Sequence, residues 1–289
     1  MPRPLAALHT PSFALGACLI AAIERDTRGC PLSDAERFNY YPATPMAMIS
    51  WVFSGQLHLV EDSSPDAAPV LGPALPRLTL SGPQRRPTTS WSPGPVHALS
   101  AGFYPEALSR LIGRSIEPYL DQTVPLQSVA DPTFISHCQA VLDTGSQAPF
   151  TTLQRVLDTL WQEPGCATQP PHLGDWLRAL STRAAHSHGG KSLRQLQRRI
   201  RDWTGQSYRD LQLYVRAEAA FVRRQEMADA GPLDLASLAA DAGFADQSHM
   251  GREIRRITGL SPARFGEHLA HDEAFWYYRL IADELRSHR

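Results

Sequence analysis

Arginine and glutamine recur at helical spacing in two stretches near the C-terminus. In the first stretch, Ser192–Thr204, the apolar residues Leu193, Leu196, Ile200 and Trp203 are spaced by three or four positions and form one face of a helix. The opposite face carries Arg194, Gln197, Arg198 and Arg201. Arginine donates two hydrogen bonds to guanine, and glutamine pairs with adenine in a similar bidentate way. Taken alone, such a face is most simply a solvated one, and a second copy of the pattern is needed to favour recognition of bases in a DNA groove.

The second stretch, Asp246–Pro262, repeats this arrangement. Met250, Ile254 and Ile257 form the apolar stripe. The outward residues are Gln247, Ser248, His249, Arg252, Arg255 and Arg256. Ser192 and Asp246 are expected N-caps, which would direct each helix N-terminus toward a phosphate.

Catalytic and metal chemistry have weaker support. A cupin metal site needs an HxH pair among the strands, and the HxH pair of this sequence, His186 and His188, lies at a helix–turn boundary instead. Cys30 and Cys138 would sense oxidants only in an exposed, cationic setting, and we favour buried or inert thiols. No nucleophile elbow, phosphate loop or dinucleotide glycine pattern is present. We expect no catalytic residue, metal or cofactor.

Proline divides the chain into two regions that position these residues differently. Of 24 prolines among 289 residues, 22 lie in residues 1–171, and only Pro232 and Pro262 follow. Because proline interrupts helix interiors and central strands, the first region should have short elements and many turns. The second region can be almost continuously helical.

In the first region, strands are expected up to about residue 104 and helices after it. Ser54-Gly55 predicts a hairpin between two of the strands. Residues 62–76 and 81–95 are expected to be loops. The predicted strands are 13–23, 47–53, 56–61, 77–80 and 96–103, and the predicted helices are 106–112, 133–142 and 150–162.

The C-terminal region should hold two units, each a helix, a glycine-containing turn and a second helix. The predicted helices are 173–185, 192–204, 208–224 and 234–244, with a last one within 246–262. We therefore expect an α+β chain with a sensor or oligomerisation domain at 1–163, a linker at 164–171 and a DNA-binding domain at 172–289. The aromatic run at 275–278 begins a tail helix, which we expect to pack on the second unit. A contact with a second copy or with RNA polymerase is the alternative.

Charge sharpens this division. The whole chain has a formal net charge of −1, which argues against a nucleic-acid binder. Residues 172–270, however, hold 15 Lys+Arg against 11 Asp+Glu, a net of +4, and the remainder has −5. This modest excess predicts a moderate salt dependence of DNA binding. No apolar run is long enough to span a membrane, and no cleavage site follows residues 13–23, so we expect a cytoplasmic protein without a membrane partner.

The C-terminal motifs resemble a known family. Residues 243–262, GFADQSHMGREIRRITGLSP, are similar to the second helix-turn-helix of AraC-type transcription regulators, and residues 192–207, SLRQLQRRIRDWTGQS, to the first. The sequence departs from the family at Ile200 and Ile254, where phenylalanine is usual, and in the first turn, HSHGGKS. The resemblance implies two units joined by a long helix that enter successive segments of the major groove. Double-stranded DNA is the implied partner.

The resemblance also assigns roles to the outward residues. Base contacts would come from Arg194, Gln197, Arg198, Gln247, Ser248, His249 and Arg252. Arg201, Arg255 and Arg256 would contact phosphates. Gly243 would occupy the tight turn of the second unit, where a positive φ suits glycine.

The N-terminal region is similar to the sensor or partner domain of one AraC-like subfamily, and in relatives this domain is a cupin-like barrel followed by dimerising helices. A homodimer and a small-molecule effector are the partners this implies. Trp51, Arg85, Arg86 and Trp91 are effector-binding candidates, although core or loop packing is the favoured explanation for the tryptophans and a solvated loop for the arginines. Two other interpretations stay open: a metal-dependent cupin-like enzyme domain fused to a DNA-binding module, and a ligand-free interaction domain.

Overall fold

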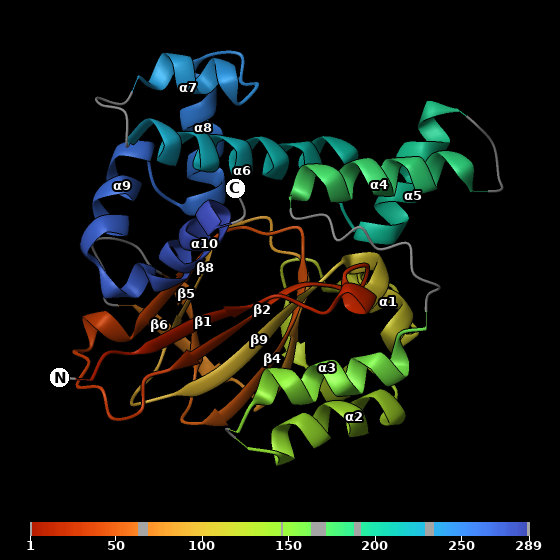
Figure 1. Ribbon diagram of the computed structural model, residues 1–289, viewed down its shortest axis with the longest axis vertical. Coiled ribbons are helices and arrows are strands. Elements are labelled where there is room, and N and C mark those ends of the chain that lie inside the picture. Colours follow the sequence, from red (N-terminus) through yellow and green to blue (C-terminus); the bar gives the residue numbers. More distant parts are fainter. Residues whose placement is uncertain are drawn as a thin grey trace.

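The computed structural model describes residues 2–62, 69–145, 147–162, 172–187, 192–228 and 234–287. An antiparallel β-sheet domain precedes an all-helical region, which confirms the expected α+β class (Figure 1). Within these residues ten strands form two sheets rather than one closed barrel. The strands are β1 (Leu5–His9), β2 (Leu19–Asp26), β3 (Phe38–Tyr41), β4 (Ala47–Ser54), β5 (His58–Asp62), β6 (Val70–Ala74), β7 (Leu78–Ser81), β8 (Thr88–Trp91), β9 (His97–Phe103) and β10 (Thr123–Pro125).

The larger sheet has the strand order β1-β2-β9-β4-β7-β10, and the smaller sheet has the order β3-β8-β5-β6. In the larger sheet Ser50 of β4 lies opposite Ser100 of β9, and Trp51 lies opposite Leu99. Because successive side chains alternate between faces, Ser50 and Trp51 point to opposite sides of this sheet. The two faces therefore have different environments, one hydroxyl-rich and one apolar.

The predicted hairpin at Ser54-Gly55 is wrong. β4 pairs with β7 and β9 in the larger sheet, whereas β5 pairs with β6 and β8 in the smaller one. Gly55 lets the chain cross between the sheets, because its φ is +81° and a Cβ there would lie 2.3 Å from the carbonyl oxygen of Pro95. Gly55 does lie in a turn, but this turn is the corner where the chain passes from one sheet to the other and not a two-residue hairpin.

Two predicted loops each contain a strand, and one predicted strand begins late. β6 lies within residues 62–76 and β8 within residues 81–95, so both loop predictions are wrong in part. Both strands are short and lie next to prolines, which conceals them in the sequence. In residues 13–23, Phe13–Leu15 is a 3-10 turn, and the strand starts only at Leu19.

Three helices pack beside the sheets, in agreement with their predicted positions. They are α1 (Pro105–Ile112), α2 (Pro132–Asp143) and α3 (Pro149–Leu160). Asp131 caps α2 by accepting hydrogen bonds from the amides of Thr133 and Phe134. The indole of Trp51 donates a 2.9 Å hydrogen bond to the carbonyl oxygen of Cys138, which places α2 against the apolar face of the larger sheet.

The helical region contains the two expected helix-turn-helix units. Its helices are α4 (Leu173–His186), α5 (Leu193–Thr204), α6 (Tyr208–Ala228), α7 (Leu235–Asp241), α8 (Gln247–Thr258), α9 (Pro262–His271) and α10 (Trp276–Ser287). Shorter 3-10 turns lie at Phe13–Leu15, Ala35–Arg37, Glu117–Tyr119, Leu126–Ser128 and Glu273–Phe275. The predicted linker at 164–171 and the unusual first turn at 188–190 fall outside the described residues. No helix in the described part of the chain is long and apolar enough to cross a membrane.

Candidate nucleic-acid interface and interdomain cavity

Local sequence explains the position of α5. Ser192 accepts a hydrogen bond from the amide of Gln195, and the side-chain oxygen of Gln195 accepts one from the amide of Ser192, so the helix begins with a capping box. Gly205 ends it with a φ of +74°. Ile200 is fully buried. The four outward residues of the sequence analysis, Arg194, Gln197, Arg198 and Arg201, are all exposed in the full chain.

Helix α8 has the same design. Asp246 caps it by accepting a 2.7 Å hydrogen bond from the amide of His249, and Gly259 ends it with a φ of +80°. Met250 and Ile257 are buried, as the apolar stripe predicts. The outward residues Gln247, Ser248, Arg252, Arg255 and Arg256 are exposed.

Two of the outward residues also have internal partners. His249 is half-buried, its ring lies edge-on to Phe244, and its Nε2 is 3.7 Å from Glu253. Arg256 donates to Asp210 of α6 at 3.3 Å. Burial raises the pKa of Asp210, but hydrogen bonds from Ser207 and Arg256 outweigh this effect and lower it overall. Arg256 therefore also links α8 to α6.

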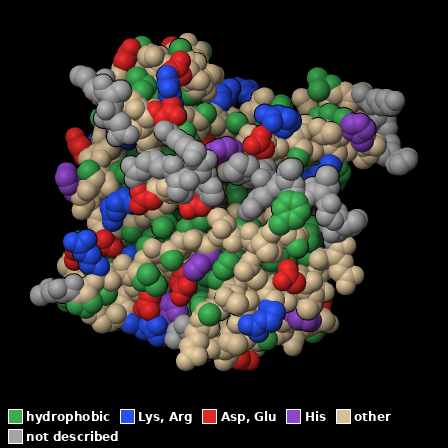
Figure 2. Space-filling view, viewed as in Figure 1, with side chains coloured by type: hydrophobic (Ala, Val, Ile, Leu, Met, Phe, Trp, Pro, Cys, Tyr) green, Lys and Arg blue, Asp and Glu red, His purple; other side chains and the backbone are tan. Residues whose placement is uncertain are grey.

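The two units are arranged around α6. Figure 1 shows α5 and α8 toward opposite ends of this long helix, with the strand domain on the other side of the molecule from α7. Apart from His249, the outward side chains of α5 and α8 are exposed. On the face shown in Figure 2, basic side chains of the helical region are interspersed with acidic ones rather than gathered into one patch. Recognition of DNA must therefore depend on the positions of individual side chains more than on the net charge of this region.

Residues 187–268 match the model of a helix-turn-helix domain family. The C-terminal region is an AraC-type helix-turn-helix domain. The matched segment begins just after α4 and ends within α9, so residues 269–287 form a tail beyond it. No curated protein sequence shows a significant match to the chain.

Solved structures of ToxT from Vibrio cholerae share a distant likeness with the whole chain. An apo variant of ToxT is 10% identical, with a TM-score of 0.36, and the match covers 92% of this chain and 97% of that one. A second ToxT structure is 9% identical, with a TM-score of 0.34, covering 91% and 98%. A third, with an unsaturated fatty acid bound, is 10% identical at a TM-score of 0.32, covering 79% and 93%.

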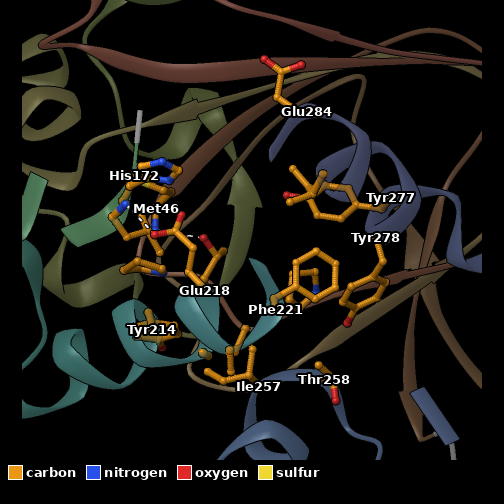
Figure 3. Close-up of a pocket in the computed structure, with 18 of the residues that line it drawn as sticks. Met46, His172, Tyr214, Glu218, Phe221, Ile257, Thr258, Tyr277, Tyr278 and Glu284 are labelled. Carbon is orange, nitrogen blue, oxygen red and sulfur yellow. Dashed lines mark hydrogen bonds between the residues drawn. The ribbon is translucent and has the colours of Figure 1, made fainter. Parts of the chain in front are cut away.

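A cavity of about 480 Å³ lies between the strand domain and the AraC-type domain. One wall comes from β1, β2 and the segment 42–48, and the other comes from α6, α8 and the tail helix α10. Figure 3 shows Met46, His172 and Glu218 on one side of this cavity, with Tyr277 and Tyr278 of α10 across from them. The lining is mainly apolar, which is typical of a small-molecule site.

A few polar groups converge on this cavity. Burial raises the pKa of Glu218 to about 7, although its carboxylate accepts a 2.9 Å hydrogen bond from the amide of Leu173 at the start of α4. The guanidinium of Arg224 lies over the ring of Phe265, and burial lowers its pKa. The hydroxyl of Tyr278 is buried without a hydrogen-bond partner. These residues carry no local spacing signal in the sequence, because the cavity forms only where elements distant in the chain meet.

None of the four effector candidates predicted from the sequence lines this cavity, and they do not gather into one site. Trp51 is fully buried in the core against α2, because the alternation of β4 turns it away from the inner face. Arg85 pairs with Asp121 in an exposed loop, and Arg86 is exposed. The indole of Trp91 donates to the carbonyl oxygen of Asp34 at 3.2 Å.

The candidate metal and thiol residues have the following surroundings within the described part of the chain. No group of three or more His, Cys, Asp and Glu side chains there could hold a metal ion. His186 is exposed and hydrogen-bonds to the carbonyl oxygen of Thr182, while His188 lies outside the described residues. Burial raises the pKa of the Cys138 thiol to about 12, so this thiol stays protonated and unreactive at neutral pH.

Proposed function

We propose that this regulator responds to a small, mainly apolar effector bound in the interdomain cavity, and that occupancy of the cavity changes its affinity for DNA. The observation that carries this proposal is that residues of both domains line the cavity. A ligand that contacts both walls binds most tightly to one relative placement of the domains. The effector then shifts the population of that placement and with it the position of α8.

DNA recognition is assigned to α5 and α8. We propose base contacts from Arg194, Gln197, Arg198, Gln247, Ser248, His249 and Arg252, and phosphate contacts from Arg201, Arg255 and Arg256. Support comes from the exposure of nine of these ten side chains on two capped helices. His249 has the weakest support, since its ring packs on Phe244.

We also propose the domain boundaries at 163 and 172, a homodimer and a contact with RNA polymerase.

The tail could make such a contact only with part of its surface, because its aromatic side chains already pack against other residues of the chain. Phe275 stacks on Tyr40 of β3 at 4.8 Å, and Tyr278 lies edge-on to Phe265 of α9 at 4.9 Å. The tail thus packs on the second unit, as predicted, and on the strand domain as well.

The cavity assignment can be tested with paired substitutions on α6. Ala220 lines the cavity, whereas its neighbour Ala219 is exposed. Selected operator DNA is titrated with the full chain in the presence and absence of a small-molecule extract of the source cells. We expect the extract to change the affinity of wild type and Ala219→Phe but not of Ala220→Phe, which fills the cavity. An equal response of both variants would place the effector elsewhere, and no response in any chain would favour a ligand-free interaction domain.

A further inference from the structure

The first residue of α5 is an exposed leucine. The spacing of apolar residues predicts that Leu193 is buried in one stripe with Leu196, Ile200 and Trp203. Its side chain is instead 70% exposed, whereas Ile200 is fully buried and Leu196 and Trp203 pack against the core. Among the described residues Leu193 is the most exposed of the large apolar side chains, and the others that are exposed lie in the strand domain. Leu193 therefore contributes little to packing within the chain.

Leu193 borders the outward face of α5. Leu193, Gln197 and Arg201 are spaced by four positions, so their side chains lie in one row along the helix. Gln197 and Arg201 are both exposed, and both belong to the proposed DNA contacts. The side chain of Gln195, in the same first turn, is occupied in the cap, where its oxygen accepts a hydrogen bond from the amide of Ser192. The apolar group of Leu193 thus stands at the start of the row that is proposed to face DNA.

Helix α8 shows what kind of residue this position holds in the other unit. Helices α5 and α8 each have 12 residues, follow a capping residue (Ser192 or Asp246) and end at a glycine with a positive φ. Aligned by these ends, Leu193 corresponds to Gln247, which is exposed and is a proposed base contact. The two units therefore present different chemistry at equivalent positions, a hydrogen-bonding amide in α8 and an apolar side chain in α5.

The major groove offers an apolar partner of its own. In helix-turn-helix proteins, residues near the N-terminus of the second helix reach the base edges in this groove. Most groups on these edges are hydrogen-bond donors or acceptors, which a leucine cannot pair with, but thymine also presents its 5-methyl group. Contact between this methyl group and an exposed leucine removes apolar area of both from water. The base that best fits Leu193 is therefore thymine.

We propose that Leu193 is a specificity-determining residue that contacts the 5-methyl group of a thymine in the half of the operator read by α5. Gln197, one helical turn further along the same row, would contact a nearby base. This proposal rests on the proposed assignment of DNA recognition to α5, and it adds one base and the group on that base that is recognised.

Removal of single methyl groups from the DNA tests this proposal. The operator is the sequence that the full wild-type chain enriches from a random library, and the α5 half is the half in which Gln197→Ala relaxes base preference. Each thymine of that half is replaced in turn by deoxyuridine, which pairs like thymine but lacks the 5-methyl group. We expect one replacement to weaken wild-type binding about fourfold, the effect of losing one buried methyl group. Fluorescence anisotropy measures the affinities.

The variant Leu193→Ala should bind the unmodified operator about fourfold more weakly than wild type. It should also bind the thymine and deoxyuridine forms of the sensitive position equally, because the side chain that distinguishes them is gone. Leu5→Ala, at a 51% exposed leucine of the strand domain, is the matched control and should keep the discrimination of wild type. Without DNA, Leu193→Ala should unfold at the same temperature as wild type.

Two results would overturn the role of Leu193 while leaving DNA recognition by α5 intact. One is an α5 half in which no deoxyuridine replacement weakens wild-type binding, and the other is a methyl sensitivity that Leu193→Ala retains. A lower unfolding temperature of Leu193→Ala would make it a packing residue and would also contradict the proposal. An unchanged base preference in Gln197→Ala would instead overturn the assignment of α5 itself, and the role of Leu193 with it.

Discussion

The amide of Ala43, in the strand domain, donates a 2.8 Å hydrogen bond to the carbonyl oxygen of Ile257, in the last turn of α8. Carbonyl groups at a helix C-terminus lack partners within the helix, so this bond satisfies one of them from another domain. Nearby, a Cβ on Gly259 would lie 3.3 Å from Cγ of Pro87. The C-terminal end of α8 is thus fixed to the domain that forms the other wall of the cavity.

Alanine substitutions of Arg252 and Arg256 should weaken DNA binding in different ways. Arg252 is exposed on the outward face of α8, so its loss should weaken binding to the preferred operator by about 1–3 kcal/mol and relax base choice at one position. Loss of Arg256 should weaken binding to all sequences alike and reduce the salt dependence. Electrophoretic mobility shifts on operator and random DNA, at two salt concentrations, measure both effects.

Asp210→Asn serves as the control for Arg256, because it weakens the ion pair between α6 and α8 but keeps the arginine. If Asp210→Asn reproduces the loss of DNA affinity, Arg256 acts by positioning α8 and the phosphate assignment is wrong.

Trp276 links the tail to the strand domain, and its replacement should destabilise the chain. Its indole donates a 2.8 Å hydrogen bond to the side-chain oxygen of Asn39, and Arg25 lies over the ring at 4.7 Å. Trp276→Phe leaves the buried Asn39 oxygen without that donor, which should cost about 1–3 kcal/mol in the free energy of unfolding. Urea denaturation measures this cost. Phe13→Ala, at a 66% exposed aromatic residue, should change stability by less than about 0.5 kcal/mol. Equal stability of Trp276→Phe and wild type would contradict the role of the tail.

Glu218 should make stability depend on pH. Its pKa is raised from the ordinary 4.5 to about 7 by burial, so the folded chain holds this proton more tightly than the unfolded chain does. The free energy of unfolding should therefore fall as pH rises from about 4.5 to 7, by up to about 3 kcal/mol from this group, and then level off. Glu218→Gln keeps an acceptor for the Leu173 amide but cannot ionise, so its pH profile should lack this component. Parallel profiles of the two chains between pH 4.5 and 8 would contradict a buried, protonated Glu218.

Gly55 should tolerate substitution less well than Gly29. Both have a positive φ, of +81° and +73°, so alanine is strained at either position. Only Gly55 also has the Pro95 carbonyl in the space of a Cβ, whereas Gly29 has nothing within 4 Å. We expect Gly29→Ala to cost about 1 kcal/mol of unfolding free energy and Gly55→Ala about 3 kcal/mol, measured by thermal or urea unfolding. Similar costs at the two positions would argue against a tight corner between the sheets.

Helices were predictable because their signals are local. The capping residues Asp131, Ser192 and Asp246 stand where the sequence places them, and the stripe containing Met250 and Ile257 is buried. Each of these features depends on residues within one or two helical turns, so the local sequence is enough to predict it.

Strand pairing and the cavities were not predictable in this way. The side chain of Trp51 lies in the core because β4 pairs with β9, a strand more than 40 positions away. Similarly, the interdomain cavity depends on Met48, Glu218 and Tyr277, which meet only when both domains are assembled. Such sites carry no local spacing signal, and a single sequence shows their residues as unrelated polar or apolar positions.

Unbiased selection of DNA from a random library tests the central claim most directly. Three full-length chains are compared: wild type, Arg198→Ala on α5 and Arg252→Ala on α8. Wild type should enrich one bipartite motif, and each variant should lose base preference within one half of it while keeping the other half. No enriched motif in wild type, or an unchanged motif in both variants, would contradict recognition of DNA by α5 and α8.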